Sequence, residues 1–237
     1  MSDHLLMVLE DDAAHASQAP NAVATLIAKQ SGFAEELRRN GTLKDSGRFR
    51  PSKEAKRVTR VGGELQVKDG PFAENGRALA GYYLVAADDA DGAARIALAC
   101  PALPTDEVSV RPIMKGRFDA DKGDKPGKIF GCAVLGNAAT EEAWVETMDR
   151  IDAETAGPFR GAEFLGGVRL LPPKTGRRVA SDGTRRAMFD GPFLESKEVI
   201  GGLFFVRVTN IDEAVRLAGE ARFVVHGTLE IRELWRS

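Results

Sequence analysis

Lys68–Glu74 reads KDGPFAE and Phe189–Glu195 reads FDGPFLE, so one Asp-Gly-Pro-Phe sequence occurs twice in the chain. Its aspartates, Asp69 and Asp190, are separated by 190 − 69 = 121 residues. The same offset relates further identical pairs: Arg48 and Arg169, Gly81 and Gly202, Asp91 and Asp212, and Arg111 and Arg232. A constant offset over this length indicates a tandem repeat without insertion or deletion across the stretch.

The first repeat shows the pattern of a small α+β domain. Apolar runs and helical spacing predict a strand, a long helix, a strand, a hairpin, another strand, a second helix near Asp88 and a closing strand. The predicted ranges are His4–Glu10, Ala22–Asn40, Thr42–Phe49, Lys56–Val61 with Glu64–Lys68, Gly81–Ala86 and Val108–Ile113.

The second repeat predicts the same order of elements. Ile129–Leu135 is its first strand, Thr140–Ala156 its first helix and Leu229–Leu234 its closing strand. Asn210–Glu213 resembles a helix N-cap with a glutamate three residues later. The order β-α-β-β-α-β with an extra hairpin predicts an α+β fold of two ferredoxin-like domains.

The domain boundaries follow from the repeat. We expect residues 1–114 to form the first copy and residues 129–237 the second. The stretch 115–128 is charged, rich in Gly and without periodicity, which is typical of a linker.

The composition excludes several classes of protein. Hydrophobic residues make up 43% of the 237 residues and charged residues 29%, which is typical of a soluble globular protein. A formal net charge of −2 gives no reason to expect nucleic acid as a partner. We expect no signal peptide, no membrane span and, because Cys100 and Cys132 form no CxxC motif, a cytoplasmic location.

The motifs carry a family resemblance. The Asp-Gly-Pro-Phe-x-Glu motif, the Ala99–Pro101 sequence ACP and the Val108–Pro112 sequence VSVRP resemble the DGPF subgroup of the YCII-related family. The second repeat lacks the Cys-Pro and Arg-Pro dipeptides. The resemblance implies a dimeric α+β barrel, here built as a pseudo-dimer within one chain. Further homo-oligomerisation is left open.

The same resemblance implies a catalytic pair of a histidine on the first helix and an aspartate, in a family that includes enzymes acting on chlorinated muconate-type acids. The chain contains three histidines, His4, His15 and His226. None lies within a predicted first helix, so we expect no His–Asp pair.

The repeated carboxylates are therefore the first candidates for chemistry. Asp69 and Asp190 could each act as a general base, provided that burial or a like charge raises the pKa. Glu74 and Glu195 could be that neighbouring charge or part of a ligand site, or they could face solvent. The alternative is structural, since Asp in such a sequence bonds nearby backbone N–H groups while Gly and Pro shape a turn.

Two repeated arginines are candidates for ligand binding. Arg111 and Arg232 lie on the closing strands and could clamp a small anionic organic ligand bidentately, or form salt bridges. No cluster of His and Cys supports a metal site, and we expect no cofactor.

Two functions remain open at this stage. One is a small-ligand-binding, accessory or regulatory protein that uses the cavity between two sheets; the resemblance implies sigma-factor-type transcription partners. The alternative is a cofactor-free lyase or isomerase that acts on a small organic acid with an Asp as general base. Whether the protein is an enzyme is not decided by the sequence.

Overall fold

The computed structural model describes residues 1–71, 77–118, 125–136, 146, 162–191, 199–220 and 227–235. The fold is mixed α+β, and strands predominate in these ranges. The chain divides into two compact units. The first unit comprises Met1–Arg48, Ala73–Ile113 and Pro173–Leu194, and the second comprises Phe49–Phe72, Met114–Pro172 and Glu195–Ser237.

The first unit contains an antiparallel sheet in the order β2-β5-β1-β6-β9-β10. Its elements are β1 (Ser2–Asp11), α1 (Asp12–Ala16), α2 (Pro20–Arg39), β2 (Leu43–Arg48), β5 (Arg77–Ala87), α3 (Ala90–Leu98), β6 (Glu107–Phe118), a 3-10 turn (Pro173–Thr175), β9 (Arg177–Ser181) and β10 (Arg186–Asp190). From Met114 onward, β6 belongs to the second unit.

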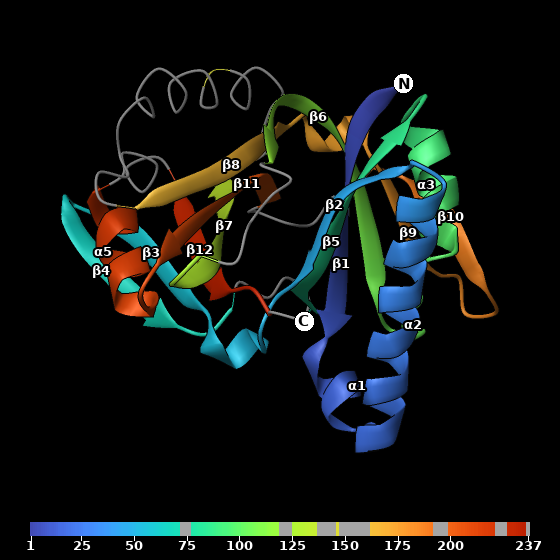
Figure 1. Ribbon diagram of the computed structural model, residues 1–237, viewed down its shortest axis with the longest axis horizontal. Coiled ribbons are helices and arrows are strands. Elements are labelled where there is room, and N and C mark those ends of the chain that lie inside the picture. The colour runs from blue at the N-terminus through green and yellow to red at the C-terminus, as the bar shows by residue number, and fades with distance from the viewer. Residues whose placement is uncertain are drawn as a thin grey trace. The chain divides into compact units, whose positions relative to one another are not determined.

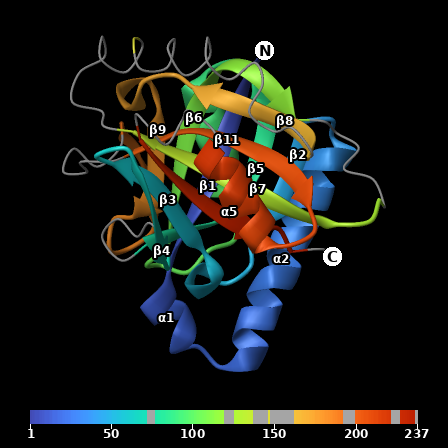
Figure 2. The same ribbon diagram turned by 90° about the vertical axis from the view of Figure 1, so that its left-hand side faces the viewer.

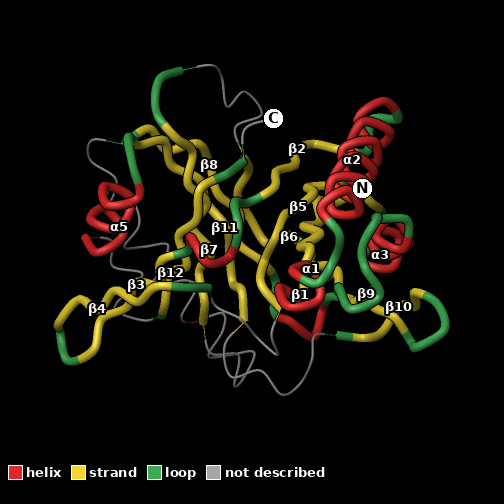
Figure 3. Tube along the Cα trace, turned by 90° about the horizontal axis from the view of Figure 1, so that it is seen from below, coloured by secondary structure: helices red, strands yellow, loops and turns green. Residues whose placement is uncertain are grey.

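Helices α2 and α3 cover one face of this sheet (Figures 1 and 3). Alternate residues of the central strands, among them Leu6, Val8 and Val108, turn toward the helices and form the core. Phe33 on α2 meets Tyr83 on β5 edge to face, with ring centroids 5.2 Å apart. Side chains alternate between the two faces of a strand, so the polar residues His4 and Glu10 of β1 lie on the helix-covered face as well.

The second unit has the strand order β8-β11-β7-β12-β3-β4. Its helix α5 packs on β12, β3 and β11 (Figure 2). The elements are a 3-10 turn (Ser52–Glu54), β3 (Lys56–Val61), β4 (Glu64–Asp69), β7 (Lys128–Gly136), β8 (Glu163–Leu170), β11 (Val199–Val208), α5 (Ile211–Glu220) and β12 (Thr228–Glu233).

The two repeats exchange one hairpin. The β3–β4 hairpin comes from the first repeat, yet it pairs with β12 of the second. The equivalent β9–β10 hairpin of the second repeat pairs with β6 of the first. The compact units therefore differ from the repeats predicted at residues 1–114 and 129–237, because each unit contains a hairpin from the other predicted repeat.

Several predicted elements are found where the sequence placed them. The predicted strands and hairpin of the first repeat coincide with β1 to β6, and the long helix is α2. The cap of α5 is confirmed, because Glu213 N donates to Asn210 Oδ1 at 2.9 Å and Thr209 N donates to Glu213 Oε2 at 2.9 Å. Apart from Glu146, the predicted helix Thr140–Ala156 lies outside the described residues.

Two predictions need correction. The sequence pattern predicted no helix directly after β1, where the structure has the short helix α1. The predicted linker 115–128 is strand at both ends, because β6 continues to Phe118 and β7 begins at Lys128. Among the described helices, none has the length and apolar character needed to cross a membrane.

Candidate functional site

The site begins at the junction of β1 and α1. Asp11 ends the strand, and its Oδ1 accepts hydrogen bonds from Ala13 N and Ala14 N, each at 3.0 Å. A side-chain oxygen that satisfies two free N–H groups is a strong N-cap, so the chain turns into a helix without a loop. The resulting single turn carries His15 in its last residues.

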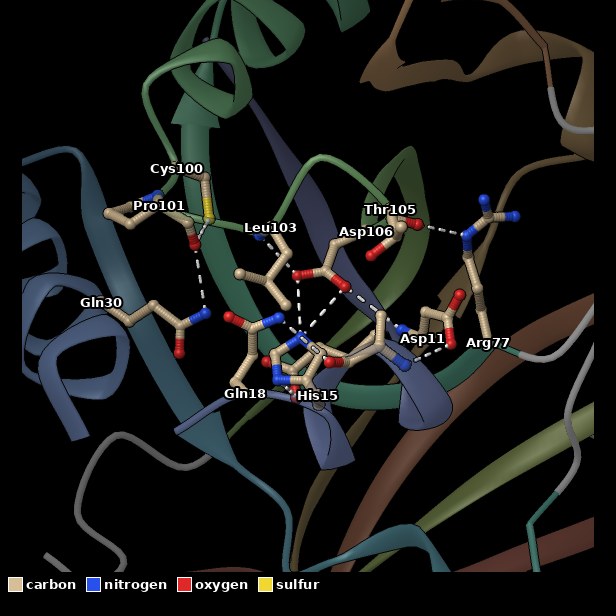
Figure 4. A network of polar contacts seen from close by, with 12 residues as sticks. Asp11, His15, Gln18, Gln30, Arg77, Cys100, Pro101, Leu103, Thr105 and Asp106 are labelled. Atoms are coloured by element: carbon tan, nitrogen blue, oxygen red, sulfur yellow. Dashed lines mark hydrogen bonds and ion pairs between the residues drawn. The ribbon is translucent and has the colours of Figure 1, made fainter. Parts of the chain in front are cut away.

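The expectation of no His–Asp pair was wrong, because α1 was not predicted. His15 on this helix forms a close pair with Asp106 (Figure 4). Its Nε2 lies 3.1 Å from Asp106 Oδ1 and 3.0 Å from Oδ2. Asp106 also accepts from Leu103 N at 2.7 Å and from Asp11 N at 3.2 Å. An ionised carboxylate can only accept hydrogen bonds, so Nε2 of His15 carries the proton and Nδ1 is the nitrogen left for other partners.

A second carboxylate lies next to the imidazole. Glu10 Oε2 is 3.7 Å from His15 Nδ1. Arg48 donates two parallel hydrogen bonds to the same carboxylate, from Nη1 to Oε1 at 2.8 Å and from Nη2 to Oε2 at 2.9 Å. Gln30 on α2 accepts from Arg48 Nη1 at 2.8 Å and donates to Pro101 O at 3.1 Å. The network thus joins β1, β2, α2 and the loop before β6.

The four charged side chains of this site differ in exposure. The exposed fraction is 27% for Arg48 and 12% for His15, against 7% for Glu10 and 0% for Asp106. A molecule that approaches from solvent therefore meets the cation and the imidazole before the two carboxylates. This order favours an anionic ligand over a cationic one.

The same side chains are the candidates for a metal. Within the described part of the chain, Glu10, His15 and Asp106 each offer a ligand atom, and these atoms lie within 4.8 Å of one another. A dication would compete with Arg48 for both oxygens of Glu10, and with two backbone N–H groups for Asp106. The donors already present therefore suit a proton-transfer site better than a metal site.

Buried groups line the inner side of this network. Cys100 ends the turn after α3 and is buried, and burial raises the pKa of its thiol to about 11. Burial also raises the pKa of the Tyr83 hydroxyl, which donates to Gln30 O at 3.4 Å. Both groups are therefore neutral near pH 7 and serve as packing rather than as bases.

The predicted aspartates lie elsewhere. Asp69 ends β4, with 82% of its side chain exposed and Lys56 Nζ at 2.5 Å. Asp190 ends β10, with 97% exposed and Arg177 Nε at 3.5 Å. Neither has the burial that a lone carboxylate base needs. Glu74 and Glu195 lie outside the described residues.

The glycine of the repeated motif has a clear structural role. Gly70 and Gly191 have φ of 94° and 61°, a region that other residues enter at a cost. Their N–H groups donate to equivalent carbonyls, Gly70 to Ala55 O at 2.9 Å and Gly191 to Gly176 O at 3.3 Å. The motif therefore ends each exchanged hairpin with a defined turn.

The predicted arginines are both buried. Arg111 lies on β6 in the first unit, and burial lowers its pKa to about 9. Arg232 lies on β12 in the second unit. Its Nη2 donates to Glu230 Oε1 at 2.6 Å, and its guanidinium carbon lies 5.2 Å from the centroid of the Phe49 ring. The ion pair of Arg232 agrees with the salt-bridge interpretation.

The second repeat lacks the carboxylates of the site. Val8 pairs with Gly81 and Val134 with Gly202, so the offset in the first strand is 134 − 8 = 126. Glu10 then corresponds to residue 136 and Asp106, at the offset of 121, to residue 227. Both positions are glycine. The carboxylates that frame His15 thus occur in the first repeat alone.

Comparison with known proteins places the chain in a family. The model of the YCII-related domain matches residues 7–118 and 137–237. A search of curated proteins found no match.

Two solved structures share a broad similarity of fold. One is a mutant chlorite dismutase from Candidatus Nitrospira defluvii, 8% identical with a TM-score of 0.43, over 99% of this chain and 91% of that one. The other is a heme-binding protein from Thermus thermophilus, 10% identical with a TM-score of 0.39, over 99% and 92%. Because the domain model covers most of the chain in two stretches, the protein belongs to the YCII-related family.

Proposed function

We propose that the first repeat carries a proton-transfer site for a small organic anion, with His15 as general acid–base and Asp106 as the group that orients it. The observation that carries this proposal is the contact of His15 Nε2 with both oxygens of Asp106. A carboxylate on one ring nitrogen fixes the tautomer and leaves the other nitrogen to exchange a proton with a ligand.

Arg48 supplies the charge that attracts the anion. It is the most exposed of the four charged groups and is held in place by Glu10 and Gln30. A positioned guanidinium binds carboxylates well because its N–H groups match their geometry. The reaction class is that of a cofactor-free lyase or isomerase, with His15 as the base in place of Asp69 or Asp190.

A screen of small carboxylates tests this function. Wild type is compared with the His15→Gln and Asp106→Asn variants in thermal-shift measurements with a panel of mono- and dicarboxylates that includes muconate. Proton NMR in D2O then follows deuterium exchange at the carbon atoms of each carboxylate that stabilises wild type. We expect His15→Gln to slow this exchange by about 10²–10⁴-fold while binding is largely retained.

His4 provides the matched control, because it is a second histidine of the same unit and is buried in β1. The His4→Gln variant should exchange protons at the wild-type rate. Two outcomes would contradict the proposal. One is deuterium exchange that is equally fast with wild type and with His15→Gln, and the other is a panel in which no carboxylate stabilises wild type.

The finer family expectations are also proposals. They comprise the DGPF subgroup, which rests on the repeated motif, a barrel-like pseudo-dimer with a ligand cavity between two sheets, and an accessory role beside transcription factors. The site described above needs none of them, since its residues all belong to the first unit.

A further inference from the structure

The exchanged hairpin of the second repeat borders the loop that carries Asp106. Arg177 Nε contacts Asp91 Oδ1 at 2.6 Å, at the start of α3. Arg186 Nη1 donates to Cys100 O at 2.7 Å, at the end of the turn after that helix. A third arginine, Arg178, contacts Glu107 directly after Asp106, at 3.4 Å. The hairpin thus holds the segment from α3 to β6 at three points.

Arg186 is the least satisfied of these arginines. Its Nε and Nη2 are buried and, within the described part of the chain, have no hydrogen-bond acceptor. Burial lowers the pKa of Arg186, and the charge of Asp106 works in the opposite direction. A guanidinium whose Nε and Nη2 are buried without an acceptor is unfavourable for stability, so its presence calls for another explanation.

The two exchanged hairpins differ at this position. Arg186 corresponds to residue 186 − 121 = 65 of the first repeat, which is leucine. Leu65 lies on the hairpin of the second unit, close to Gly219 on α5. That unit has glycine in place of Glu10 and of Asp106. Arg186 therefore lies in the unit that contains Glu10 and Asp106, and Leu65 lies in the unit that lacks both carboxylates.

We propose that Arg186 is a positioning residue for the His15–Asp106 pair, contributed by the second repeat to the site of the first. It holds the carbonyl of Cys100, and Pro101, the next residue, is held by Gln30. With both anchors in place, the loop places Asp106 so that its oxygens face His15. This proposal rests on the proposed function, and it explains why the repeat without the carboxylates is retained in the chain.

The test observes the His15–Asp106 pair directly in the unliganded protein. The proton on His15 Nε2 is followed by NMR and assigned by its loss in His15→Gln. The Arg186→Leu variant introduces the residue of the other repeat. We expect its Nε2 proton to exchange with water about tenfold faster, because the loop that carries Asp106 loses one of its two anchors and opens locally more often. Arg186→Lys, which keeps the charge, should restore part of the slow exchange.

Arg185→Leu is the matched control, since Arg185 lies next to Arg186 and its side chain is 85% exposed. It should leave the proton unchanged. If wild type shows no protected His15 proton, the proposed function itself fails. If wild type shows it and Arg186→Leu retains it at the same exchange rate, only the role of Arg186 is overturned. A poorly folded Arg186→Leu is replaced by Arg186→Gln, for which the same two outcomes hold.

Discussion

His15 Nε2 lies 3.0 Å from Asp106 Oδ2, although 91 residues separate the two in sequence. The contact holds α1 against the loop that precedes β6, so it links the ends of two neighbouring strands, β1 and β6. Because Asp106 is fully buried and accepts from two backbone N–H groups as well, we expect the pair to contribute to stability in addition to its proposed role in proton transfer.

Asp106 is expected to matter more to stability than His15. The Asp106→Asn variant replaces one acceptor oxygen by a donor, which leaves a buried N–H group or the imidazole without an acceptor. We expect a loss of about 1–3 kcal/mol in the free energy of unfolding. His15→Gln, at a partly exposed position, should lose less than 1 kcal/mol on the same scale, about the net worth of one hydrogen bond. Urea denaturation measures both, and an equal loss would argue against this ranking.

Glu10 and Arg48 are expected to be strongly coupled. Arg48→Met leaves Glu10 buried without its cation, and we expect a loss of about 2–4 kcal/mol, reduced from the value of a fully buried pair by the partial exposure of Arg48. The double variant Glu10→Gln with Arg48→Met should lose less than the sum of the single variants. A double-mutant cycle measures this coupling.

The exposed pair Arg216 and Glu220 on α5 is the control for that cycle. Exposed pairs four residues apart on a helix couple by about 0.3–0.5 kcal/mol. A coupling between Glu10 and Arg48 no larger than this would show that their two parallel hydrogen bonds contribute little to the stability of the site.

The repeat could be predicted because identical residues recur at one constant offset. The α2 helix could be predicted because its apolar residues recur at helical spacing. The α1 helix has one turn and no apolar periodicity, so only the cap Asp11 before Ala13 and Ala14 signals it. Without that helix, His15 appeared to lie outside any helix. A second signal was present in Glu10, a polar residue within an apolar strand at a helix-facing position.

The exchange of hairpins could not be predicted from the sequence for a different reason. The turn Gly62-Gly63 and the flanking residues of β3 and β4 specify the hairpin itself. They do not specify which strand it joins, because the same hairpin can pair with a closing strand of either repeat. That choice is made by contacts distant in sequence, such as those of Arg177 with Asp91.

His4 is expected to make stability depend on pH. Burial lowers its pKa in the folded protein below the ordinary 6.5, against smaller opposite effects of Ser2, Asp3 and Asp89. The unfolded chain therefore binds a proton first as the pH falls below about 6.5. Stability is unaffected by His4 above that pH and decreases below it, until the lowered folded pKa is reached, by at most about 1.4 kcal/mol per pH unit.

The second repeat supplies the variant that tests this. Position 4 corresponds to 4 + 126 = 130, which is Phe130, also buried. The His4→Phe variant should lose stability less steeply than wild type between pH 6.5 and the lowered folded pKa, in urea denaturation at a series of pH values. Parallel curves for the two proteins would refute the role of His4.

The Asp-Gly-Pro-Phe motif is expected to act in folding and not in chemistry. Gly70 and Gly191 have positive φ, and a Cβ at either position would meet no atom within 4 Å, so backbone strain alone opposes alanine there. Gly70→Ala and Gly191→Ala should each reduce the free energy of unfolding by about 1 kcal/mol. Asp69→Asn and Asp190→Asn, at exposed positions, should change it by less than about 0.5 kcal/mol and leave proton exchange of a bound carboxylate at the wild-type rate. Slower exchange in either aspartate variant, with stability unchanged, would instead return these aspartates to the role of general base, because a turn residue has no other means of affecting proton transfer at His15.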